Sequence, residues 1–168
     1  QNPTPSKKPK LTLLAKDVSY EVSLVNNENP EFLQNIQVNQ VAKTIIEKAI
    51  SGTVACYSFN FRDSLQPRSL EEVVHALGKG TDCYTTVNDE TGELDSICVD
   101  KDIDFKEIQG LAFIEDWYLN NSTMEIIKEV KAIAPIRCFY HATGDDTQTE
   151  LIKTIPFVMY LKNHDKGK

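Results

Sequence analysis

The chain has 168 residues, of which 40% are hydrophobic and 26% are charged, as expected for a globular protein of about one domain. Its 18 basic and 25 acidic residues give a net charge of −7, which repels phosphate backbones and disfavours nucleic-acid binding. It contains no apolar run of about 18 residues, so the sequence predicts no membrane-spanning helix.

Both ends of the chain are predicted to lie outside the folded domain. The first residue is Gln1 and not Met, which favours an exported protein whose leader has been removed. Residues 1–16 begin with three prolines among polar and basic residues, so we expect a disordered tail. Residues 163–168 form a second, charged tail. Residues 17–162 are therefore predicted to form a single domain.

The first half of that domain is predicted to alternate strands and helices. Residues 17–25 alternate apolar and polar side chains, as half-buried strands do. A helix is predicted to begin at Asn39 as its N-cap, to carry one apolar stripe and to end at Gly52. Residues 53–60 read as a short strand. A second helix follows, because Ser69 and Glu72 have the spacing of a capping box, and Gly78 is expected to end it.

Residues 81–88 and 93–100 are predicted to pair as a hairpin. Cys83 lies opposite Cys98 if the loop has an even number of residues, whereas a three-residue loop puts the two sulfurs on opposite faces. The sequence therefore leaves two alternatives open: a disulfide between these cysteines, or two free thiols. The four cysteines are widely spaced and contain no CxxC pair, so the sequence does not predict a zinc site.

A long central hairpin is predicted over residues 110–136. Two alternating runs flank a break at residues 120–122, where asparagine tolerates a positive φ. The return strand is expected to begin at Met124. After Pro135 we expect separate strands over residues 137–142 and 151–161. This order of elements favours an α+β fold, with a mostly antiparallel sheet built from hairpins and two helices packed on it.

No pattern of catalytic residues emerges, and the sequence predicts a protein that is not an enzyme, with no cofactor and no metal. His75, His141 and His164 are isolated. The alternating acids at positions 100, 102 and 104 lack the glycine and the bidentate carboxylate that a calcium loop needs. Glu115 and Asp116 are neighbours in a predicted strand and point to opposite faces, so they cannot share one substrate.

The central hairpin offers two further patterns. Residues 121–123 match the N-glycosylation sequon, which indicates an exposed hairpin tip. Aromatic residues are frequent on the later strands, and any that stay exposed in one patch would mark a protein-binding surface.

Two groups of motifs resemble the GldN/PorN family. Residues 47–57, followed by Pro67 and residues 69–73, resemble that family's first helix, strand and second helix. The run Glu115-Asp116-Trp117-Tyr118 resembles its acidic-Asp-Trp-aromatic strand, and Met124 with Glu125 resembles its Met-acidic return strand. The resemblance covers residues 17–161. Typical members continue beyond the position of Lys168, so we expect a shortened relative.

The resemblance implies a structural component of type IX secretion and gliding motility in the periplasm of Bacteroidetes. It also implies contacts with a ring lipoprotein or with copies of the same chain, and it makes residues 115–118 and Met124 candidate interaction residues. An alternative reading is a stand-alone periplasmic domain that binds a small ligand or a peptide. A deep polar pocket would favour that alternative.

Overall fold

The computed structural model describes residues 10–25, 38–59, 66–142 and 149–161. The elements are, in chain order, β1 (Leu11–Ser23), α1 (Val38–Ile50), β2 (Cys56–Tyr57), β3 (Pro67–Arg68), α2 (Leu70–Ala76), β4 (Gly80–Val87), β5 (Leu94–Lys101), the 3-10 helix η2 (Phe105–Glu107), β6 (Ile108–Asn120), β7 (Ile126–Ala142), β8 (Thr149–Thr154) and β9 (Met159–Tyr160). Within the described residues, 56% lie in strands and 17% in helices, so the fold is α+β and dominated by antiparallel sheet.

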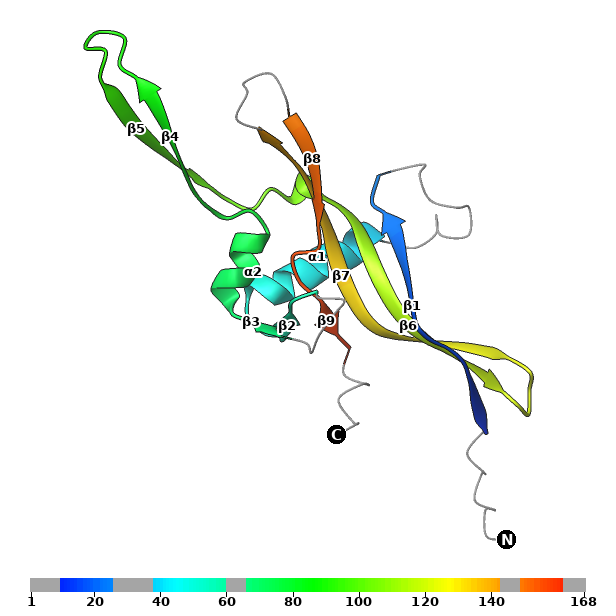
Figure 1. The fold of residues 1–168 in the computed structure, drawn as a ribbon. Helices are drawn as coiled ribbons and strands as arrows, with labels where there is room; N and C mark the ends of the chain where they lie inside the picture. Colours follow the sequence, from blue (N-terminus) through cyan, green and yellow to red (C-terminus); the bar gives the residue numbers. More distant parts are fainter. Residues whose placement is uncertain (1–9, 26–37, 60–65, 143–148, 162–168) are drawn as a thin grey trace.

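The main sheet is organised around the central hairpin that the sequence predicts. Its strand order is β1-β6-β7-β8, and β9 also pairs with β7 (Figure 1). Strands β6 and β7 pair from Ile108 opposite Arg137 to Leu119 opposite Ile126. β1 and β7 flank β6 along most of its length, so residues of β6 contact a neighbouring strand on both sides.

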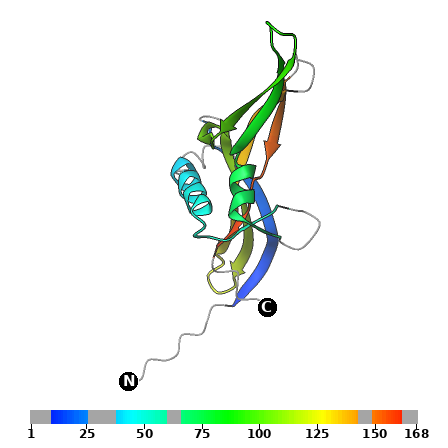
Figure 2. The ribbon, with the colours of Figure 1, turned by 90° about the vertical axis from the view of Figure 1, so that its left-hand side faces the viewer.

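Helices α1 and α2 cover one face of this sheet (Figure 2). The stripe of α1 and the apolar side chains of α2 meet the side chains of β1 and β6 that point toward the helices. The buried members of this core include Val22, Ile45, Ile46, Val73, Leu77, Leu111, Phe113 and Phe157. A smaller cluster on the opposite face joins Ala132, Ala134 and Val158. Small residues there let neighbouring chain segments pack closely.

Helix α2 begins and ends as predicted. The Ser69 side chain accepts a hydrogen bond from the Glu72 amide, and the Glu72 side chain accepts one from the Ser69 amide. Gly78 adopts a φ of +102°, and an added Cβ there would lie 2.5 Å from the Arg137 side chain. That side chain donates to Glu107 at 2.6 Å and to the Ala76 carbonyl at 3.2 Å. Glycine is therefore needed where α2 meets β7.

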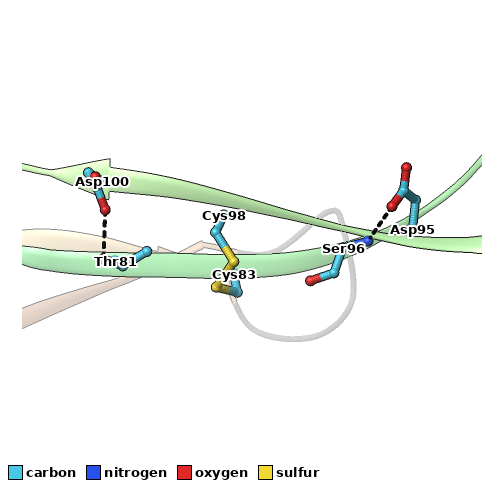
Figure 3. The surroundings of a disulfide bond; sticks show 6 residues. All are labelled: Thr81, Cys83, Asp95, Ser96, Cys98 and Asp100. Atoms are coloured by element: carbon cyan, nitrogen blue, oxygen red, sulfur yellow. Dashed lines mark hydrogen bonds between the residues drawn. A yellow bond between two sulfur atoms is a disulfide. The ribbon is translucent and has the colours of Figure 1, made fainter.

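Strands β4 and β5 form a separate hairpin that projects from the body, and we call residues 80–101 the arm (Figure 1). The loop closes with the Asn88 amide bonded to the Glu93 carbonyl, which is the even register. Cys83 lies opposite Cys98, and the two are joined by a disulfide (Figure 3). The Thr81 hydroxyl donates to Asp100 at 2.7 Å in the same hairpin.

The structure differs from the prediction at the start of the first strand and at Pro135. Strand β1 begins at Leu11 and not at residue 17, so residues 11–16 belong to the sheet and not to a tail. They join it because their backbone pairs with β6, with Leu11 opposite Asn120. Strand β7 runs through Pro135 without a break. Proline is tolerated there because the partner of β7 changes from β9 to β8 around this position.

Other predicted boundaries were also wrong. Helix α1 begins at Val38, so Asn39 lies inside it and is not its cap. The strand predicted over residues 53–60 shrinks to β2, and the strand predicted over residues 151–161 divides into β8 and β9. β2 and β9 each pair with their neighbour strand at only two positions. The expected tails over residues 1–9 and 163–168 lie outside the described residues.

Candidate functional site

The motif that carries the family resemblance lies where both neighbours of β6 bulge. Val18 and Ala15 of β1 lie opposite Glu115 and Trp117, so β1 holds one more residue than β6 between these pairs. On the other side, Ala132 and Val130 lie opposite Ile114 and Glu115, so β7 also holds one more residue. Such bulges increase the local twist and re-aim side chains.

The bulged residues meet at Asp116. Asp17, whose φ is +55°, donates its backbone amide to the Asp116 carboxylate at 2.9 Å. The ammonium of Lys131 bridges the carboxylates of Asp17 and Asp116, lying 3.2 Å from the latter. We call Asp17, Asp116 and Lys131 the bulge cluster. It joins β1, β6 and β7 through side chains, and Asp116 is 6% exposed.

Burial acts against the charge of Lys131, but the hydrogen bonds and charges of Asp17 and Asp116 outweigh it. The pKa of Lys131 is therefore raised above its ordinary value. The lysine stays protonated at neutral pH, so the bulge cluster is a charged network and not a neutral one. A buried carboxylate needs such a partner, because an unpaired charge in the interior is costly.

Glu115 lies on the opposite, helix-facing side of β6. Its carboxylate accepts hydrogen bonds from the Tyr20 hydroxyl at 2.8 Å and from the Trp117 indole at 2.9 Å. Burial, followed by the hydrogen bond to Glu115 and the charge of that residue, raises the pKa of Tyr20 to about 12. As predicted, Glu115 and Asp116 point to different faces, and each holds its own partners.

Beyond the bulges, the three strands continue past the helices as an extension that we call the tip, made of residues 10–16 and 117–128 (Figures 1 and 2). The Lys128 ammonium lies 4.4 Å from the centre of the Trp117 ring. Burial, followed by the nearby carboxylates of Asp116 and Glu129, raises the pKa of Tyr118. Trp117 and Tyr118 therefore stand at the junction of the bulge cluster with the tip.

Met124 lies in the turn of the tip and not in the return strand that the sequence predicts. Its φ is +61°, and its amide donates to the Asn120 carbonyl at 2.7 Å. The Asn120 side chain accepts from the amides of Ser122 and Thr123, which shapes the turn. Met124 is 70% exposed, and the sequon residues 121–123 are exposed beside it.

The motif singled out in the sequence supplies four residues of this region, Glu115, Asp116, Trp117 and Tyr118. The sequence misses three others, Asp17, Lys131 and Tyr20, which come from strands far away in the chain. One feature of β7 indicated the bulge. Val130 and Ile133 are three residues apart, yet both pack toward the helix core, whereas residues on one face of a regular strand are an even number apart. A break of period two of this kind indicates a bulge.

The other candidates for chemistry have structural contacts. Asp100 accepts from Thr81, Asp102 pairs with Lys79, and Asp104 caps the 3-10 helix η2. His75 and His141 lie exposed on different elements, while His164 is outside the described residues. Within the described residues, histidine, cysteine, aspartate and glutamate side chains do not gather in any group of three that could hold a metal ion.

Comparison with known families identifies the chain. A family model described as "Gliding motility associated protein GldN" matches residues 9–163, nearly the whole chain. The chain belongs to the GldN family. A search among curated proteins finds no match. In the described part of this GldN-family chain, none of the helices has the length and apolar character needed to cross a membrane.

The match to GldN includes both strands of the central hairpin and the whole of β1. The bulge cluster and the carboxylate of Glu115 therefore lie within the part of the chain that defines family membership. The contacts of Asp17 and Lys131 with Asp116 and of Tyr20 with Glu115 join strands of the same sheet, whereas the contact of Trp117 with Glu115 lies within β6.

Proposed function

We propose that this GldN-family chain is a non-enzymatic structural component of the gliding-motility and type IX secretion machinery. It acts in the periplasm through contacts with other envelope proteins. Membership of the GldN family supports the link to gliding motility. The observation that carries the role in protein contacts is the apolar surface of the tip.

The tip exposes more apolar side chains than a solvated sheet end needs. Leu11, Leu13 and Ile127 lie in register with Asn120 and Tyr118 on one face, and Ile126 lies opposite Leu119 on the other. The exposed members are Leu11, Leu13, Leu14, Met124, Ile126 and Ile127. Exposed apolar groups gathered in one place typically mark an interaction surface.

The contacts of the acidic pair support a role other than catalysis. Glu115 is engaged by Tyr20 and Trp117, and Asp116 is engaged by Lys131 and the Asp17 amide. A general acid or base must reach its substrate, whereas these carboxylates are 4% and 6% exposed. Their position favours a structural role, in which these side chains hold the tip rigidly on the sheet.

The test is complementation in the source bacterium. Deletion of the gene is expected to abolish spreading on agar and secretion of type IX cargo, and the wild-type gene is expected to restore both. A tip variant, Ile126→Glu with Ile127→Glu, is expected to be folded and exported to the periplasm and to restore neither. Glu150→Lys with Leu151→Lys, on β8, is the control and is expected to restore both.

Two results would contradict the proposal. One is normal spreading and secretion in the deletion strain. The other is a fractionation in which the full chain stays in the cytoplasm of cells whose motility is intact. A pull-down of the tagged chain from the periplasm then identifies which envelope proteins are lost from the tip variant but kept by the control.

A further inference from the structure

The disulfide of the arm lies on an open face of a two-stranded hairpin. Cys83 and Cys98 face each other across β4 and β5 (Figure 3), and both residues are exposed. Their neighbours on the same face have short side chains and are exposed as well; they are Thr81, Thr85, Ser96 and Asp100. These side chains leave the two sulfurs accessible from outside the molecule.

The edges of the arm are open too. Among the described strands, β4 and β5 pair only with each other, whereas β6 and β7 have a neighbour on each side. A thiolate that reduces a disulfide approaches one sulfur from the side opposite the sulfur that leaves, so its rate depends on access. Within the described residues, no third strand of the arm obstructs this approach.

The arm also lacks a core that would hold its two cysteines together after reduction. Every residue of β5 is exposed, and so is every residue of β4 except Thr86. A two-stranded hairpin is marginally stable by itself, and exposed disulfides are the ones that thiols reduce readily. The disulfide of the arm therefore has the properties of a labile disulfide.

Neither free thiol of the chain is presented as the nucleophile. Cys56 is buried in the core beneath the helices, and burial raises the pKa of its thiol, which disfavours the reactive thiolate. Cys138 is half-buried in the main sheet, where it lies opposite Lys153. A thiolate that attacks the arm is therefore expected to come from another molecule.

The charge of the arm favours one kind of attacking thiol. The arm has six acidic residues and one lysine, a net charge of −5. Asp82 adjoins Cys83 in the chain, and Asp100 follows Cys98 on the same face. A thiolate is itself an anion, so these carboxylates repel it unless positive charge surrounds it. An acidic free thiol such as glutathione is disfavoured, and a protein thiol in basic surroundings is favoured.

We propose that the arm disulfide is a site of thiol–disulfide exchange for a CxxC dithiol protein whose active site has a basic rim. One thiolate of that protein attacks a sulfur of the arm, which forms a mixed disulfide and releases the other cysteine. Its second thiolate then attacks the mixed disulfide. The partner leaves oxidised, and the arm gains two electrons and two protons. The reduced arm then unfolds while the body stays folded.

Reduction of the full chain by small thiols tests access and charge. Cysteamine carries an ammonium that offsets its thiolate, whereas 2-mercaptoethanesulfonate carries a second negative charge. Each rate is divided by the rate of the same thiol on oxidised 2-mercaptoethanol, a neutral disulfide. Cysteamine is then expected to be at least about threefold faster on the arm at low salt, and added salt should narrow the difference. Alkylation and mass spectrometry of peptides from residues 80–101 measure the rates.

Two matched variants locate the source of this charge preference. Asp82→Asn with Asp100→Asn removes two charges beside the disulfide and is expected to reduce the preference. Glu47→Gln with Glu125→Gln removes two charges from α1 and the tip and is the control, which should keep the preference of the wild type. Far-ultraviolet circular dichroism verifies that both variants are folded.

A trapping experiment tests the protein dithiol. The probe is purified thioredoxin whose second CxxC cysteine is replaced by serine, so that the mixed disulfide persists. It is made in two forms, with lysines or with glutamates around the CxxC motif. The basic form is expected to trap Cys83 or Cys98 at least about threefold faster than the acidic form.

Several results would overturn the inference. One is a native disulfide that small thiols reduce more than about a hundredfold more slowly than they reduce the urea-unfolded chain, since covered sulfurs react slowly. Others are a rate that does not depend on the charge of the thiol, and trapping only at Cys56 or Cys138. A reduced arm that stays protected from hydrogen exchange overturns the unfolding step. None of these results involves the tip, so the exchange site can fail while the proposed function stands.

Discussion

Lys131 is the residue on which the buried charge of Asp116 depends. Its side chain is 12% exposed and bridges two carboxylates from different strands. Removing one partner from a buried ion pair is strongly destabilising, because the remaining charge has no compensation. Lys128, three residues away, lies over the Trp117 ring in a more exposed position.

We expect Lys131→Met to lower the free energy of unfolding by about 3 kcal/mol. Lys128→Met is the control and is expected to cost about 0.5 kcal/mol, since exposed cation–π contacts contribute little. Urea denaturation at pH 7 measures both. Adding Asp116→Asn to Lys131→Met should recover part of the loss, and equal effects of the two single variants would show that the bulge cluster does not stabilise the sheet.

Tyr20→Phe tests the other face of β6. The hydroxyl of Tyr20 donates to a carboxylate, so its removal is expected to cost about 1.5 kcal/mol at pH 8. The pKa of Tyr20 is about 12 in the folded chain against an ordinary value of 10.0. Its contribution is therefore complete below pH 10 and is lost as the pH rises from 10 toward 12.

The free energy of unfolding of Tyr20→Phe should consequently fall less steeply than that of the wild type over this alkaline range. Lys131 is present in both proteins, so its own alkaline titration does not change the comparison. Tyr140→Phe, which alters a tyrosine that is 72% exposed, is the control and should follow the wild type. Parallel curves for Tyr20→Phe and the wild type would argue against a buried hydrogen bond to Glu115.

At the scale of elements, the arm depends on its disulfide more than the body does. A two-stranded hairpin alone is marginally stable in water, and the arm exposes nearly all of its residues. The sulfurs close a short loop between residues 83 and 98. In the chain-entropy model, a cross-link over a loop of this size stabilises by about 3 kcal/mol.

Replacing both Cys83 and Cys98 by serine is therefore expected to open the arm while the body stays folded. Hydrogen exchange followed by mass spectrometry should show fast exchange in peptides from residues 80–101 and unchanged exchange in peptides from β6 and β7. Cys138→Ser alters a free thiol and is the control. Slow exchange in the arm of the double variant would show that the hairpin stays folded without its disulfide.

At the scale of the whole molecule, the two projecting ends give an elongated outline around a small core (Figure 1). A compact chain of this length has a radius of gyration of about 15 Å. We expect small-angle X-ray scattering of dilute protein, extrapolated to zero concentration, to give a larger value. A value near 15 Å would mean that the arm or the tip folds back onto the body, which would cover the surfaces proposed for thiol exchange and for protein contacts.

Local patterns in the sequence determined much of this fold. The capping box of Ser69 and Glu72 and the long central hairpin depend on residues close together in the chain, whereas the register that pairs Cys83 with Cys98 was left open by the sequence and was decided by the structure. The opposite orientation of Glu115 and Asp116 follows from strand geometry alone. Interactions of this range are encoded by spacing and residue type, so they could be predicted.

Only the tertiary structure decided which distant segments meet. Residues 11–16 read as a tail, yet they form a strand because β6 supplies backbone partners. Pro135 reads as a strand end, yet β7 continues because its partner strand changes there. The meeting of Asp17 and Lys131 at Asp116 depends on bulges in two strands. The break of period two in β7 could indicate a bulge there, but strand partners are chosen by long-range pairing across the sheet, so no local pattern shows which residues meet.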